Sequence, residues 1–176
     1  MEMAQSMSVN KSTSNLSHKL SDKWVLWAHL PHDTDWTLKS YINIVEFDTA
    51  EQVIAVINTI PSTMIKNCML FVMKQGINPT WEDKKNSKGG CFSFKVINKD
   101  VYTVWNDCIK ALTGGSISDN TNFYNSITGI TISPKKSFCI LKFWMTNLEF
   151  QNPKEIKETN GLSCHGCLFK KHNPNY

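Results

Sequence analysis

The sequence predicts an α+β fold: a curved, mostly antiparallel sheet of seven to eight strands with three helices on its convex face. Apolar residues alternate with period two in about seven short runs, which is typical of strands with one buried face. Longer segments instead repeat apolar residues at helical spacing. These blocks follow no strict strand–helix–strand order, which favours antiparallel pairing over a parallel sheet.

The elements are expected in a definite order along the chain. Residues 1–17 are polar and rich in Ser and Asn, so we expect a disordered tail, followed by a single domain over residues 18–176. The N-cap candidates Asp48 and Thr49 predict a helix that ends at Pro61. The other predicted elements are strands over 24–28, 38–47, 68–74, 91–97, 127–132, 138–144 and 167–171, a helix over 100–112 and a short helix after Pro153.

Length and composition limit the class of protein. With 176 residues, 41% of them hydrophobic, the chain can form one ordinary core. No run approaches the roughly 18 consecutive apolar residues of a membrane span, and no secretory signal begins the chain, so we expect a monomer in the cytoplasm, with the nucleus as a further location. Six scattered cysteines predict reduced thiols.

The charge is carried in an unusual way. All 19 basic residues are lysines, against 15 acidic residues, and the net charge is only +4. Without arginine, any anion must be held by lysine ammonium groups, backbone amides or helix ends. This modest excess does not by itself indicate nucleic acid.

Two tryptophans lie in predicted loops. Trp81 sits in the polar segment 76–90, and Trp36 follows the first predicted strand, at the same end of an antiparallel sheet. Trp81 has a simple structural alternative, which is to fold back onto the rim of the sheet. Two facing indoles about 7 Å apart would instead hold one flat ring, and stacking of a base on an aromatic side chain contributes about 1–3 kcal/mol.

The carboxylate of Glu82, directly after Trp81, would make such a site selective. An ionised carboxylate only accepts hydrogen bonds, and guanine offers N1–H and N2–H₂ side by side. Methylation on N7 makes the ring cationic, which adds about 0.5–2 kcal/mol of cation–π attraction. The chemistry therefore favours 7-methylguanine.

A longer set of residues resembles the mRNA cap-binding translation initiation factor 4E family over about residues 18–172. The matching elements are His18-x-Leu20-x-x-x-Trp24-x-x-Trp27, Trp36, Phe47-Asp48-Thr49-x-Glu51, Gly76-Ile77-x-Pro79-x-Trp81-Glu82-Asp83-x-x-Asn86-x-x-Gly89-Gly90, Trp105, Gly129 and Trp144. The resemblance implies a curved eight-stranded sheet backed by three helices. It also implies that the cap lies between Trp36 and Trp81, that Glu82 binds the guanine edge, and that Trp144 lies near the N7-methyl group.

The chain departs from the family pattern at the phosphate-binding positions. The resemblance implies three basic positions in the family. At these positions this chain has Cys91, then Lys135 where the family has an arginine, and Ile140 where the family has a second basic residue. We therefore expect Lys135 to bind phosphate, with Lys136 and Lys142 as substitutes for the lost position. The alternative for Lys135 and Lys136 is that they are solvated turn lysines.

The convex face also departs from the pattern. In the family, a tryptophan and two leucines on two helices bind the Tyr-x-x-x-x-Leu-Φ helix of initiation factor 4G and of repressors. The matching residues here are Ile54, Asn106 and Lys110. Since Asn and Lys remove apolar area, we expect an initiation factor 4G-like or 4E-binding protein to use a non-standard surface here, or no such partner to bind.

These observations favour a non-enzymatic protein that binds the 7-methylguanosine cap of mRNA for translation initiation. One alternative is a relative that sequesters or protects capped mRNA without recruiting the scaffold. Another is an enzyme or metal module built on Cys164-His165-Gly166-Cys167 and His172, but a single CxxC supplies only two zinc ligands. We expect no cofactor, no metal and no catalytic residue, because no catalytic spacing is present.

Overall fold

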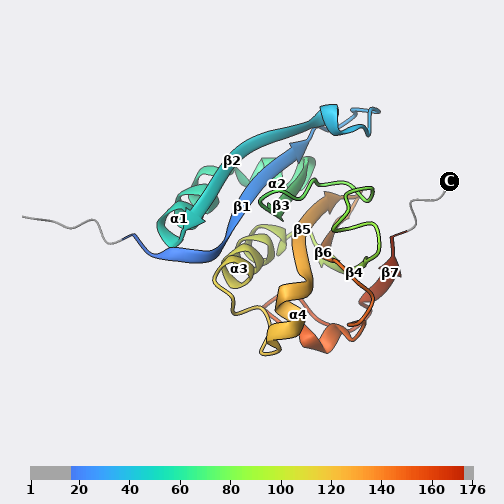
Figure 1. The fold of residues 1–176 in the computed structure, drawn as a ribbon. Helices are drawn as coiled ribbons and strands as arrows, with labels where there is room; N and C mark the ends of the chain where they lie inside the picture. The colour runs from blue at the N-terminus through green and yellow to red at the C-terminus, as the bar shows by residue number, and fades with distance from the viewer. Residues whose placement is uncertain (1–16, 173–176) are drawn as a thin grey trace, which may run out of the picture.

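The computed structural model describes residues 17–172, so residues 1–16 of the predicted disordered tail lie outside the described part. Seven strands form one sheet in the order β2-β1-β3-β5-β6-β4-β7, and every neighbouring pair is antiparallel (Figure 1). The strands are β1 (Lys19–His29), β2 (Tyr41–Thr49), β3 (Met69–Lys74), β4 (Gly90–Ile97), β5 (Ile127–Pro134), β6 (Phe138–Met145) and β7 (Leu168–Lys171). The predicted antiparallel sheet is confirmed.

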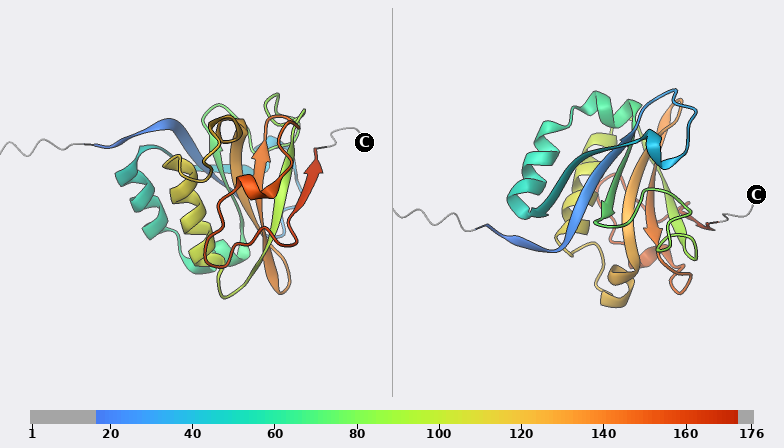
Figure 2. Two further views of the ribbon diagram at one scale, coloured as in Figure 1. Left: turned by 90° about the horizontal axis from the view of Figure 1, so that it is seen from below. Right: turned by 45° about the horizontal axis from the view of Figure 1, so that its top comes forward.

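Helices cover one side of this sheet. They are α1 (Ala50–Thr59), α2 (Ser62–Asn67), α3 (Val101–Thr113) and α4 (Thr121–Ser126). The sheet is curved, and α1, α2 and α3 lie on its convex face, while α4 leads into the start of β5 (Figure 2). Within residues 17–172, no helix has both the length and the apolar character needed to cross a membrane.

The period-two alternation of the strands separates two apolar clusters. In β3, Leu70 and Val72 face the helices and belong to the main core, together with residues such as Ile65 and Trp105. Phe71 and Met73 point to the opposite, concave face and form a second, smaller cluster with Trp144. The concave face therefore has an apolar floor formed by buried side chains.

Two helices were not predicted. Pro61 ends α1, as expected, but it also occupies the N-cap of α2, because its fixed φ suits a helix start. Asn120 begins α4 by accepting hydrogen bonds from the main-chain N–H groups of Asn122 and Phe123, in a stretch whose composition is typical of a loop.

Two predicted elements are shorter than expected. The strand predicted over 38–47 begins only at Tyr41, because Leu38–Ser40 form a 3-10 turn. The segment after Pro153 forms a single 3-10 turn over Pro153–Glu155 rather than a helix. The third helix on the convex face is therefore α2, next to α1 in the sequence.

Candidate functional site

A cleft of about 380 Å³ opens on the concave face where the β1–β2 and β3–β4 loops meet the ends of β5 and β6. Most of the predicted site residues line this cleft. The lining consists of Trp36, Tyr41, Met69, Phe71, Pro79, Thr80, Trp81, Glu82, Thr131, Ser133, Lys135, Lys142 and Trp144. The two indoles from separate loops thus reach the same cavity, and Trp81 is 39% exposed rather than packed away in the core.

The β3–β4 loop is fixed by Asp83 and Asn86. The carboxylate of Asp83 accepts hydrogen bonds from the main-chain N–H groups of Asn78 and Lys85, both at 2.9 Å. Asn86 is fully buried, and its amide donates to the carbonyl oxygens of Asn78 (3.1 Å) and Thr80 (2.9 Å). Its own side-chain oxygen accepts from the Thr128 hydroxyl on β5 at 2.8 Å. The loop is therefore tied to the sheet on both sides of Trp81.

Glycine at position 89 allows the loop to return close to the sheet. A Cβ at Gly89 would lie 1.7 Å from the carbonyl oxygen of Met145, so no larger residue fits. The Trp-Glu-Asp-x-x-Asn-x-x-Gly segment thus combines two residues that line the cleft with three that hold the loop.

The β1–β2 loop positions Trp36 through its neighbours. The carboxylate of Asp35 accepts from the main-chain N–H of Thr37 at 2.8 Å, and the Thr37 hydroxyl donates to it at 3.0 Å. Both hydrogen bonds lower the pKa of Asp35, and the main-chain hydrogen bond has the larger effect. The Trp36 ring stacks on His29, with centroids 4.1 Å apart and planes 2° apart. His29 therefore covers one face of the Trp36 indole.

Trp144 forms part of the cleft floor. It is only 4% exposed, and its indole N–H donates to the Thr131 hydroxyl at 2.8 Å. Phe71 packs edge-on against it at 6.4 Å, and the His172 ring lies 4.9 Å away on another side. This packing holds Trp144 in one orientation.

Tyr41 is a cleft residue that the sequence analysis missed. Burial, and to a smaller extent the negative charge of Glu82, raise the pKa of Tyr41 to about 12. Its phenol therefore stays protonated at neutral pH and can donate a hydrogen bond inside the cleft. The pairing of Tyr41 with His29 across β1 and β2 places it at the cleft, next to the Phe71 and Trp144 cluster, and this register is set by the tertiary structure.

The three lysines predicted to bind phosphate have different positions. Lys135 and Lys142 both line the cleft, and neither forms an ion pair within residues 17–172. Lys135 also borders an adjoining cavity of about 230 Å³ that contains His29 and His32. Lys136 is exposed in the same turn as Lys135 but does not line the cleft, so its role stays a prediction.

The three residues predicted to form a convex partner surface differ in exposure. Ile54 on α1 is 49% exposed, and Lys110 on α3 is ion-paired with Asp107 at 2.8 Å. Asn106 is buried, with 5% exposure, and its side-chain oxygen has no hydrogen-bond partner among the described residues. The sequence pattern did not foresee that Asn106 is buried, so it offers little area to a partner.

The CxxC segment forms no metal site in the described part of the chain. Across residues 17–172, no three His, Cys, Asp or Glu side chains gather around a common point that could hold a metal ion. All six cysteines are free thiols, and the Cys164 thiol donates to the carbonyl oxygen of Pro153 at 3.1 Å. The ring Nδ1 of His172 instead binds the carbonyl oxygen of Asn86 at 2.8 Å.

Fold and cleft together define a class: a protein whose curved antiparallel sheet carries two loop indoles and a carboxylate in one cleft on its concave face. The sequence profile described as Eukaryotic initiation factor 4E matches residues 19–168. The chain belongs to this family.

Relatives with known names and structures agree with this assignment. Eukaryotic translation initiation factor 4E of Candida albicans is 26% identical over 161 residues, covering 85% of this chain and 74% of its own. The Xenopus laevis protein of the same name is 28% identical, covering 80% and 67%. A schistosome eIF4E crystallised with m7GpppG and 4E-BP is 25% identical with a TM-score of 0.69, covering 76% and 75% of the two chains. An Ascaris suum eIF4E-3 in complex with m7G cap shares the fold, with a TM-score of 0.67, 22% identity and coverage of 76% of both chains.

Proposed function

We propose that this protein binds the 7-methylguanosine 5′ cap of mRNA and acts in translation initiation. The observation that carries the proposal is that Trp36, Trp81 and Glu82, which come from two separate loops, line one cleft. The solved relatives from schistosome and Ascaris suum contain m7GpppG and m7G cap, and the named relatives are initiation factors rather than sequestering proteins. Such a role belongs in the cytoplasm and requires no catalysis.

Each cleft residue has a distinct chemical task in this proposal. The methylated guanine stacks between Trp36 and Trp81, where its positive charge strengthens the attraction to both indoles. Glu82 accepts hydrogen bonds from N1–H and N2–H₂ of the base. Trp144 faces the N7-methyl group, and the phosphates extend toward the lysines.

We expect each of the substitutions Trp36→Ala, Trp81→Ala and Glu82→Gln to weaken binding of a cap mononucleotide by about 1–3 kcal/mol, or roughly 5- to 150-fold. The loss has two causes: the tryptophan variants lack a stacking surface, and glutamine cannot accept both guanine donors. Fluorescence titration with 7-methyl-GMP measures this directly. Unmodified GMP should bind the unmodified protein more weakly, because its ring is not cationic.

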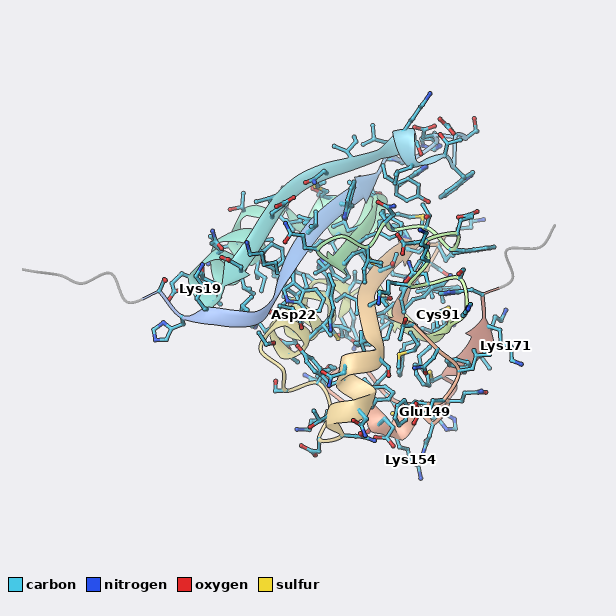
Figure 3. All side chains as sticks on the ribbon, in the orientation of Figure 1. Lys19, Asp22, Cys91, Glu149, Lys154 and Lys171 are labelled. Carbon is cyan, nitrogen blue, oxygen red and sulfur yellow. The ribbon has the colours of Figure 1, made fainter. Side chains whose placement is uncertain are left out.

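Glu149→Gln is the matched control, because Glu149 is exposed and lies away from the cleft lining (Figure 3). It should bind the cap as the unmodified protein does. If cap quenching were the same in the unmodified protein and in both tryptophan variants, the ring would not lie between Trp36 and Trp81.

The two cleft lysines predict how affinity depends on phosphate and salt. We expect Lys135→Ala and Lys142→Ala each to reduce the gain in affinity from 7-methyl-GMP to 7-methyl-GTP, because each removes a positive charge from the cleft rim. Lys154→Ala, at an exposed position that does not line the cleft, serves as the control and should keep the gain. Titration at several salt concentrations measures this gain in affinity. A gain that did not depend on salt in the unmodified protein would contradict the role of the two lysines in phosphate binding.

A further inference from the structure

The half of the sheet beyond the cleft carries charge of one sign. Strands β5, β6, β4 and β7 contain four lysines and no aspartate or glutamate. At the opposite half of the sheet, β1 and β2 mix lysines with Asp22, Glu46 and Asp48. Within these four strands no carboxylate neutralises the lysines, which favours the binding of anions along them.

The strand register places three of these lysines on the face that bears the cleft. Phe92 and Phe94 of β4 point into the main core, so the alternate residues of this strand face the other way. These alternate residues of β4 are Cys91, Ser93 and Lys95. Ser93 lies opposite Lys142 of β6, and Cys91 lies opposite Lys170 of β7. Lys95, Lys142 and Lys170 thus share one face across three neighbouring strands.

The environment of Cys91 shows that two of the lysines converge over β4. Burial raises the pKa of the Cys91 thiol, and the nearby positive charges of Lys142 and Lys170 act in the opposite direction. The positive charges of both lysines therefore act on the same side chain, and the register places these lysines on the two strands that flank β4. Lys95 and Lys170 form no ion pair within residues 17–172.

Two lysines lie one strand beyond the positions at which the family resemblance implies basic residues. The two positions where the family resemblance called for basic residues, Cys91 and Ile140, are each paired across the ladder with a lysine, Lys170 and Lys95. From β6, whose Lys142 lines the cleft, to β7 is two strand spacings, or about 10 Å. These lysines are therefore placed for an anion that continues beyond the cleft.

Exposed aliphatic side chains accompany the lysines. Leu168 precedes Lys170 by two residues on β7 and is 59% exposed, and Ile97 follows Lys95 by two residues on β4 and is 46% exposed. A single-stranded nucleic acid has both features to match such a surface, since its phosphates bind ammonium groups and its bases can lie on apolar side chains.

We propose that Lys142, Lys95 and Lys170 form a basic track that binds the phosphodiester backbone of the RNA immediately following the cap. The track rests on the proposed cap-binding function, which brings a covalently attached polyanion to its start at Lys142. It lengthens the RNA-binding site from the cleft across β4 to the edge strand β7. Its ligand is single-stranded RNA of any sequence, because lysine contacts to phosphate carry no base specificity.

The test compares a cap dinucleotide, m7GpppG, with a capped oligouridylate of ten nucleotides. For Lys95→Ala with Lys170→Ala, we expect affinity for the dinucleotide to stay unchanged and affinity for the capped oligonucleotide to fall about tenfold at 50 mM salt. Each phosphate contact to single-stranded RNA contributes about −0.7 to the slope of log K against log salt. For the double variant, the slope of log K against log salt should therefore be shallower by about 1.4. Between 50 and 200 mM salt, the unmodified protein should then lose roughly sevenfold more affinity than the double variant.

Lys66→Ala with Lys154→Ala is the matched control, since it removes the same net charge from exposed positions on α2 and in the turn after Asn152. Figure 3 shows Lys154 well away from Cys91. The proposed track is wrong if both double variants lose equal affinity for the capped oligonucleotide. It is also wrong if Lys95→Ala with Lys170→Ala binds the capped oligonucleotide as the unmodified protein does, and that result would point to a protein partner for this surface. Failure of the unmodified protein to bind m7GpppG would instead refute the proposed function and the track with it.

Discussion

A peptide helix with the Tyr-x-x-x-x-Leu-Φ motif is expected to bind the unmodified protein about two to four decades more weakly than it binds the variant Ile54→Trp/Asn106→Leu/Lys110→Leu. The motif lays apolar side chains on a shallow groove, and each fully buried contact of leucine size contributes about 1.5–3 kcal/mol. Here Lys110 carries a charge paired with Asp107, and Ile54 offers less area than an indole. Two weakened contacts amount to about 3–6 kcal/mol.

The burial of Asn106 determines how the substitution Asn106→Leu should affect stability and peptide binding. Its side-chain oxygen is buried without a partner, so leucine at this position removes an unsatisfied polar group and should not destabilise the protein. The restoring effect is expected mainly from Ile54→Trp and Lys110→Leu.

Isothermal calorimetry would measure this comparison, with Ile97→Trp/Lys99→Leu as a control. That control makes the same kinds of change at the exposed end of β4 and should not gain peptide affinity. Sub-micromolar binding of the peptide to the unmodified protein would show that the convex face uses other residues.

Substitution of Asn86 by alanine is expected to lower the free energy of unfolding by roughly 3–5 kcal/mol, a large part of the 5–15 kcal/mol typical of a domain. Asn86 is fully buried and is the common partner of Asn78, Thr80 and Thr128. Alanine leaves all three partners without this hydrogen bond. Because the same bonds hold the loop around Trp81, cap affinity should fall together with stability.

Urea unfolding followed by tryptophan fluorescence would measure the effect. Asn78→Ala is the control, because Asn78 enters this network through its main-chain atoms alone. An Asn86→Ala variant that unfolded within about 0.5 kcal/mol of the unmodified protein would contradict the structural role of Asn86, since that is the usual size of a neutral surface change.

Local patterns in the sequence were sufficient for most of the strands and for the main cleft residues. Period-two alternation located β3, β4, β5 and β6 to within a few residues. The segment around Trp81 could be interpreted because it is contiguous: its cleft-lining residues, Asp83, Asn86 and Gly89 all lie within one loop that folds largely on itself. The short helices α2 and α4 were missed because each has only six residues, fewer than two turns, which is too short to show a period.

The sequence by itself thus determined the antiparallel sheet, its apolar core and the pairing of two loop indoles with a carboxylate. The tertiary structure alone decided that Tyr41 lines the cleft, that His29 stacks on Trp36, that Asn106 is buried, and that Lys170 lies beside Cys91. Each of these facts depends on strand register or helix packing between distant segments. A one-residue shift in register moves every side chain of a strand to the other face, and the irregularity of pairing between Leu26 and Trp27 introduces such a shift in β2. Contacts between distant segments are set by this three-dimensional register, which no local pattern in the chain encodes.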